Sequence, residues 1–184
     1  MRISTSLLAG ALVVAFGAAL IIPAVGSAEE AAKEAPAYKY VGASGCKACH
    51  MGEKNGKIWE SYLETAHAKA FDKLPEASRT DAACLGCHTT GHGKAMAAGK
   101  TAADLQGVQC EACHGPGSDY KALTVMKDRE QAVAKGPIVP TEKVCAGCHT
   151  AEIPKACWAG AAAAPKFEYA AAAKKIEHHI PPKK

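Results

Sequence analysis

The chain has 184 residues, a formal net charge of +4 and only 5% aromatic residues, and much of its apolar content is alanine. Large apolar side chains are too scarce for a conventional core, so we expect something other than side chains to fill part of the interior. The modest positive charge forms no basic run interleaved with aromatic residues, which argues against nucleic acid as a partner.

The first 28 residues have the pattern of a cleaved signal peptide. Arg2 gives a positive start, residues 7–22 form an apolar run, and residues 26–28 are small enough for a cleavage site. The alternative is an uncleaved anchor, although the run is short for a bilayer span and no basic stop-transfer cluster follows it. We therefore expect export to the periplasm, with the cell surface as an alternative, and no membrane span in the mature form. Residues 29–40 are expected to form a flexible lead-in, and residues 41–184 a single domain.

Four copies of the pattern Cys-X-X-Cys-His account for eight of the nine cysteines. Two thiols three residues apart can add to the two vinyl groups of one haem, and the adjacent histidine then becomes the proximal iron ligand. Structural zinc is the main alternative, but a zinc site needs no histidine attached to each cysteine pair. Disulfides alone would not explain the repeated histidine. The pattern therefore predicts four covalently attached haem c groups. The predicted thioether cysteines are Cys46, Cys49, Cys84, Cys87, Cys110, Cys113, Cys145 and Cys148, and the predicted proximal ligands are His50, His88, His114 and His149.

A helix is predicted over residues 57–74, where Pro75 ends it. His67 falls at helical spacing from Trp59, Leu63 and Phe71, so it lies on the apolar stripe of that helix. A histidine on an apolar face is usually a core residue. In a chain with four irons, a distal haem ligand is the better interpretation.

Two further candidates for distal ligation follow in chain order. His92 lies in a glycine-flanked loop four residues after His88, too close to reach the distal side of the same haem. It could bind a neighbouring iron or hydrogen-bond a propionate. Met126 lies in a helix predicted over residues 118–135, with Gly136 as the stop. Met126 fits ordinary packing, and ligation of an otherwise open iron is the alternative.

The C-terminal part contains an odd cysteine and a histidine pair. Cys157 has no second cysteine and no following histidine at haem spacing, so we expect a buried small apolar residue, with an intermolecular disulfide as the alternative. A helix is predicted from Pro165 through Ile176. We expect one of His178 and His179 to bind iron, and the other to interact with the helix dipole.

Several of these stretches together resemble a known family. They are residues 58–74, 84–93 and 107–117, the fourth motif, and the histidine after the C-terminal helix. The chain resembles the tetrahaem cytochrome c-554 type, the electron carriers of nitrifiers and their relatives in anaerobic respirers. The resemblance implies a mainly α fold, with helices and loops wrapped around four closely packed haems and little or no strand. It also implies that His67 and a C-terminal histidine are distal ligands, and that one haem lacks a sixth ligand.

The chain departs from the nitrifier members of that family in two places. Those members carry a histidine shortly after the third motif, whereas residues 122–126 contain none. One more iron is therefore open, or is bound by Met126 or His92. The ending at residues 175–178 is more similar to the anaerobic-respirer relatives, which favours His178 over His179 and puts hydroxylamine oxidoreductase in doubt as the partner.

The sequence as a whole predicts an electron-transfer protein and not an enzyme. Four haems in one small domain would pass electrons between redox partners, such as other multihaem cytochromes or a quinol-oxidising cytochrome, in weak encounters. No catalytic residue is predicted, because no separate acid and base constellation is visible. Two alternatives remain: a haem enzyme that reduces a small nitrogen-oxide ligand at an open iron, and a subunit of an extracellular cytochrome filament or other oligomer.

Overall fold

The computed structural model describes residues 38–136, 139–150, 153–157 and 166–178, all within one unit that runs from Ala35 to Lys184. The predicted signal peptide, most of the lead-in and His179 lie outside these ranges. Among the described residues, no helix combines the length and the apolar character that a bilayer crossing requires.

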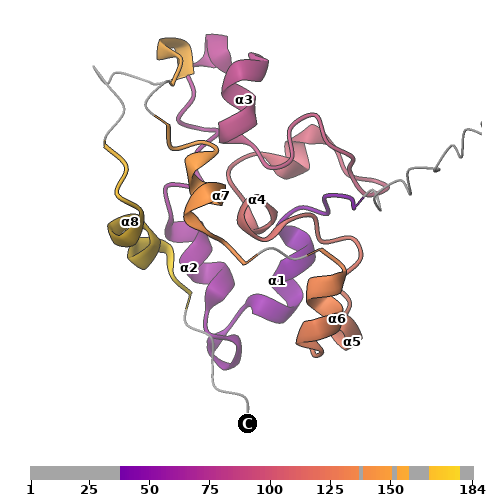
Figure 1. Ribbon diagram of the computed structural model, residues 1–184. Coiled ribbons are helices and arrows are strands. Elements are labelled where there is room, and N and C mark those ends of the chain that lie inside the picture. The colour runs from indigo at the N-terminus through magenta and orange to yellow at the C-terminus, as the bar shows by residue number, and fades with distance from the viewer. Residues whose placement is uncertain (1–37, 137–138, 151–152, 158–165, 179–184) are drawn as a thin grey trace, which may run out of the picture. The chain divides into compact units, whose positions relative to one another are not determined.

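Short helices joined by turns make up the described part of the chain (Figure 1), where backbone pairing of the β type is limited to two isolated bridges. The prediction of a mainly α fold with little or no strand is confirmed. The α-helices are α1 (Ser44–His50), α2 (Ile58–Glu64), α3 (Ala82–His88), α4 (Cys110–His114), α5 (Leu123–Met126), α6 (Arg129–Ala134), α7 (Glu142–Ala146) and α8 (Tyr169–Ile176). The 3-10 turns are η1 (Glu53–Asn55), η2 (Glu76–Ser78), η3 (Ala102–Leu105) and η4 (Lys155–Cys157).

The helix expected over residues 57–74 is wrong in length, because α2 ends at Glu64. The hydroxyl of Thr65 donates to the carbonyl of Tyr62 at 2.7 Å and accepts from the amide of Ala68 at 3.2 Å. These bonds replace the helical pattern with a turn. His67 therefore lies in the turns after α2 and not on a helical stripe.

The single helix expected over residues 118–135 is also wrong, because the segment forms two short helices, α5 and α6, that pack on each other. The side chain of Asp128 accepts from the amides of Glu130 and Gln131 at 3.0 and 3.1 Å and so begins the second helix. The predicted stop is confirmed, since Gly136 follows α6 with a φ of 109°. The C-terminal helix begins at Tyr169, four residues after the predicted start.

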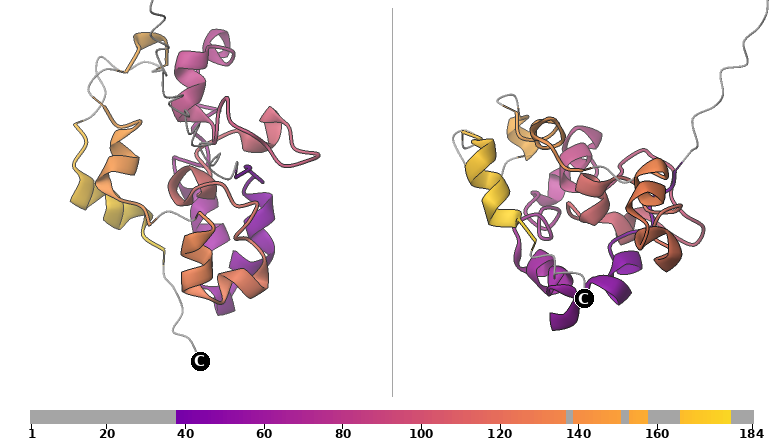
Figure 2. Two further views of the ribbon diagram at one scale, coloured as in Figure 1. Left: turned by 45° about the vertical axis from the view of Figure 1, so that its right-hand side comes forward. Right: turned by 60° about the horizontal axis from the view of Figure 1, so that its bottom comes forward.

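The side-chain core is small, as the composition predicted. One buried cluster joins Leu74, Cys84 and Cys157, and a second joins Tyr120, Val125 and Ala132. Helix α1 packs on α2, and α3 packs on η4. In Figures 1 and 2, α8 lies beside α7 in every view. The described helices thus contact one another in pairs and not around one large apolar centre.

A buried threonine joins the second motif to the segment that leads into the third. Thr90 is 1% exposed; its hydroxyl donates to the carbonyl of Gly107 at 2.9 Å and accepts from the amide of Gln109 at 2.7 Å. Gly107 has a φ of +80°, and a Cβ there would lie 2.6 Å from the carbonyl oxygen of Ala68. Only glycine allows this close approach, which brings three segments distant in sequence together.

Replacing Thr90 with valine is expected to destabilise the protein by about 3 kcal/mol, because it leaves a buried carbonyl and a buried amide without partners. The measurement is the midpoint of guanidinium unfolding of the haem-loaded protein, followed by circular dichroism. Thr90→Ser keeps the hydroxyl and should lose much less. A larger loss in Thr90→Ser than in Thr90→Val would show that the methyl group, and not the hydrogen bonds, stabilises this junction.

Candidate haem-binding site

Each Cys-X-X-Cys-His motif lies on or directly after a short helix. The first three motifs end α1, α3 and α4 at their histidines, and the fourth starts within α7 at Cys145. Residues i, i+3 and i+4 lie on one face of a helix. A helical motif therefore presents two sulfurs and one imidazole on the same side, as attachment of one flat cofactor requires.

The first and third motifs meet at their leading cysteines. Cys46 and Cys110 share a side-chain hydrogen bond, which is the main reason why the pKa of Cys46 is raised and the pKa of Cys110 is lowered. Both thiols are half-buried. Two cysteines that are distant in sequence thus lie side by side, which brings the two attachment sites together.

The fourth motif contacts both the second and the third. Burial, followed by a side-chain hydrogen bond with Cys87, raises the pKa of Cys148 to about 12. Burial, followed by the charge of Cys145, raises the pKa of Cys113. The thiols of the four motifs therefore form a continuous series of neighbours, in the order first, third, fourth and second.

His67 lies next to the predicted proximal ligand of the fourth motif. The ring centroids of His67 and His149 are 5.9 Å apart, at an interplanar angle of 64°. The backbone of His67 is fixed by the segment that leads into the third motif, since the carbonyl of His67 accepts from the amide of Val108 at 2.9 Å. Burial, and then His149, lowers the pKa of His67, which favours the neutral imidazole that binds metals. His149 also stacks on Phe167, with the ring centroids 4.5 Å apart.

A second imidazole pair joins the C-terminal segment to the third motif. The ring centroids of His178 and His114 are 6.3 Å apart, at an interplanar angle of 37°. Burial, followed by His114 and then His50, lowers the pKa of His178. Burial, followed by His114, lowers the pKa of His50. Three imidazoles thus lie near one another where the first and third motifs meet.

Both pairs fit two axial ligands of one iron. Bonds between imidazole nitrogen and a first-row metal are about 2 Å long, so two axial imidazoles hold their ring centres roughly 6 Å apart. The observed separations of 5.9 and 6.3 Å agree with that spacing. The third and fourth motifs therefore fit a haem with two histidine ligands.

His88, the predicted proximal ligand of the second motif, is oriented by a backbone carbonyl. Its Nδ1 lies 2.6 Å from the oxygen of Ala70, so Nδ1–H donates and the other ring nitrogen is left for a metal. This bond also ties the second motif to the turns that carry His67.

The remaining candidates for distal ligation are less well placed. His92 is exposed, in the turn after the second motif. Met126 is 39% exposed at the end of α5. Neither is brought against a proximal histidine in the described part of the chain, and both stay predictions. His179 lies outside the described residues.

The second motif differs from the prediction in one respect. Cys84, a predicted thioether residue, forms a disulfide with Cys157, 73 residues along the chain. Cys157 is buried, as expected, but its partner lies within the same chain. A sulfur in a disulfide cannot also form a thioether, so the second motif fits a haem only when this disulfide is open. The seven other cysteines are free.

Sequence reasoning missed a buried carboxylate inside the third motif. Glu111 is 1% exposed, and its oxygens accept from three backbone amides: Val41 at 2.9 and 3.1 Å, Gly42 at 2.7 Å and Gly117 at 2.6 Å. The sequence does contain a sign of this role, because an acidic residue is unexpected between two cysteines that would attach a largely apolar cofactor.

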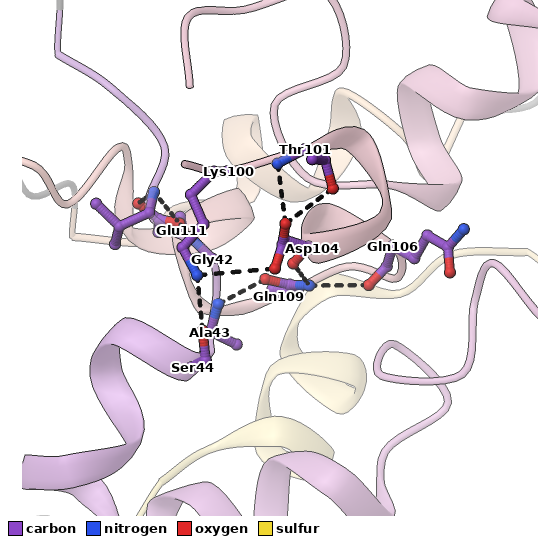
Figure 3. A network of polar contacts seen from close by, with 10 residues as sticks. Gly42, Ala43, Ser44, Lys100, Thr101, Asp104, Gln106, Gln109 and Glu111 are labelled. Carbon is purple, nitrogen blue, oxygen red and sulfur yellow. Dashed lines mark hydrogen bonds and ion pairs between the residues drawn. The ribbon is translucent and has the colours of Figure 1, made fainter. Parts of the chain in front are cut away.

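The side chain of Gln109 makes further hydrogen bonds between the same segments (Figure 3). Its side-chain oxygen accepts from the amide of Ala43 at 2.6 Å, and its amide group donates to the carbonyls of Asp104 and Gln106, each at 2.9 Å. Glu111 and Gln109 together hold the segment that enters α1 against the third motif. The first and third attachment sites therefore share one polar support.

Comparisons with known proteins agree with this site. The family described as cytochrome c554 and c-prime matches residues 45–115, which include the first three motifs. The curated cytochrome c-554 of Nitrosomonas europaea is 28% identical over 154 residues. That match takes in 67% of this chain and 61% of the relative, so it spans less than two thirds of the relative's length. The solved structure of reduced cytochrome c554 from the same organism is 27% identical, with a TM-score of 0.50 over 75% of this chain and 78% of that chain.

The helical motifs, the paired imidazoles and these matches define the class of protein, a multihaem c-type cytochrome. Its cofactor is covalently attached haem c. More particularly, the chain is similar to cytochrome c554 of Nitrosomonas europaea, and the cytochrome c554 and c-prime family matches the part of it that carries the first three motifs.

Proposed function

We propose that this protein is an electron carrier that passes electrons through four haems between redox partner proteins. Bound haem supplies one-electron chemistry at an iron that a second axial histidine closes to exogenous ligands. The observation that carries the proposal is the pairing of His67 with His149 and of His178 with His114, at 5.9 and 6.3 Å. Imidazoles on both sides suit electron transfer better than substrate binding.

The contacts between motifs support passage through the protein. The leading thiols of the first and third motifs share a hydrogen bond, and the thiols of the fourth motif influence those of the third and second. Cysteines that would attach different haems therefore lie near enough to influence one another. We infer that Cys49, Cys87, Cys113 and the other predicted thioether residues hold the haems in this same order of neighbours.

The location and partners form part of the proposal. Export by residues 1–28 would place the mature domain, residues 41–184, in the periplasm or at the cell surface. There it would meet other multihaem cytochromes or a quinol-oxidising cytochrome of anaerobic respiration. The predicted signal sequence and the similarity to cytochrome c-554 support this placement.

A second candidate, reduction of a small nitrogen-oxide ligand, is favoured by the arrangement at the second motif. His67 and His178 are paired with the predicted proximal histidines of the fourth and third motifs. The proximal histidine of the second motif, His88, instead donates a hydrogen bond to the carbonyl of Ala70. An iron bound by His88 would have its sixth position open if none of the remaining candidates, His92, Met126 and His179, binds it. A chain that also reduces nitric oxide or nitrite there would be an enzyme as well as a carrier.

Low-temperature electron paramagnetic resonance with an optical titration tests both candidates. We expect the haems of the third and fourth motifs to be low-spin and unaffected by cyanide or nitric oxide, because His114 with His178, and His149 with His67, would hold the iron from both sides. Four low-spin haems that ignore both ligands would remove the second candidate. A majority of high-spin haems would contradict the electron-carrier proposal.

A further inference from the structure

We propose that the Cys84–Cys157 disulfide is a redox-controlled gate on haem attachment at the second motif. The two cysteines are 73 residues apart, and their exposed fractions are 1% and 3%. The inference rests on haem attachment at this motif and is independent of the protein's role as an electron carrier.

Both cysteines are presented by anchored elements. The side chain of Asp81 accepts from the amide of Ala83 at 2.9 Å and fixes the start of α3, which carries Cys84. The hydroxyl of Ser78 donates to the carbonyl of Ala156 at 2.7 Å and fixes η4, which carries Cys157. The sulfurs thus meet because two separate segments are held in place, and not because one flexible loop folds back.

The apolar surroundings favour a persistent bond. Cys84 and Cys157 share a buried cluster with Leu74, against which Phe71 and Ile153 pack. Buried sulfurs are shielded from small thiols, and thiol–disulfide exchange requires access to a sulfur. Opening the disulfide therefore requires a reductant that reaches this cluster, or a local displacement of η4.

The second motif differs from the others in the bonding state of its two cysteines. Cys87 is free and contacts Cys148 of the fourth motif. Cys84 is bonded to Cys157 instead. The six cysteines of the other motifs are free. Three attachment sites can accept a haem as the chain stands, and the second must first be reduced.

The chemistry balances with one added reactant, a dithiol of the thioredoxin type. The dithiol supplies two electrons and two protons and becomes a disulfide itself, while the Cys84–Cys157 bond breaks to give two thiols. The Cys84 sulfur then forms a bond to one vinyl carbon of haem, and the thiol proton passes to the other carbon. This second step involves no net oxidation. Cys157 remains as a thiol that can close the disulfide again only while Cys84 is unmodified.

The test is the haem count of the full chain produced with a haem-attachment system and measured by intact mass and peptide mapping. In the wild type we expect a three-haem species with a linked Cys84–Cys157 peptide beside the four-haem species. The ratio of dithiol to disulfide changes tenfold for about 30 mV of redox poise. Growth at a poise 30 mV more reducing should therefore lower the ratio of the three-haem to the four-haem species about tenfold. Cys157→Ala should remove it at any poise.

Two further variants keep the test decisive. Cys157→Ser is closer in size and should behave as the alanine variant does, which covers a failure of Cys157→Ala to fold. Ala156→Ser changes the neighbouring exposed residue of η4 and should keep the wild-type response. The proposal is overturned if the wild type shows no linked peptide at any poise, or if the three-haem species persists in both Cys157 variants. Electron transfer by the four-haem species would be unaffected by either result.

Discussion

Replacing His67 with alanine is expected to convert the haem of the fourth motif from low-spin to high-spin and to raise its reduction potential. His67 lies 5.9 Å from His149, centroid to centroid, and its main chain is tied to Val108, so its imidazole is fixed where a distal ligand is needed. Loss of a strong donor favours the ferrous state; because axial ligands set haem potentials over about 0.8 V, we expect a rise on the order of 0.1 V.

Electron paramagnetic resonance and a spectroscopic redox titration of the four-haem protein measure both effects. The matched control is His92→Ala, because His92 is exposed and the same side chain is removed. The control should leave the spin states and potentials unchanged. A high-spin haem in the His92 variant, with none in the His67 variant, would reverse the assignment. The distal ligand would then be the loop histidine.

The sequence predicted the chemistry of this molecule better than its helices. The spacing of the four motifs identifies the cofactor because two thiols and an imidazole must lie on one side of a helix, and this requirement is local. His67 stays a predicted distal ligand, and its position has a cause that the sequence did not show. It is placed by a turn at Thr65 and by Val108, which is far away in sequence, and not by a helical stripe.

Other features depend on contacts that a single sequence does not reveal. Nothing near Cys157 indicates which cysteine lies opposite, since its partner is 73 residues away. The division of residues 118–135 was readable in principle, because Asp128 is a common helix-capping residue. The pairing of His178 with the third motif was not readable, because it depends on how the chain between them is arranged.

Replacing Glu111 with glutamine is expected to destabilise the protein by about 3 kcal/mol or more and to raise the reduction potential of the third haem. The carboxylate accepts only, and three backbone amides point at it. A glutamine side chain would turn its own N–H groups toward some of those donors, leaving buried groups unpaired. Loss of a negative charge also favours the ferrous state, on the order of tens of millivolts for unit charges roughly 10 Å apart at an effective dielectric constant of about 20.

Glu142→Gln is the matched control, since Glu142 is an exposed residue at the start of the helix that carries the fourth motif. It should leave the unfolding midpoint and all potentials near the wild-type values. If Glu111→Gln lowers the unfolding midpoint and leaves the third potential unchanged, the carboxylate acts only as an anchor for residues 41, 42 and 117. If the potential rises and the haem count stays at four, Glu111 both fixes the entry to α1 and adjusts the electron affinity of the site that it supports. Equal effects in the two variants would contradict any special role for the buried carboxylate.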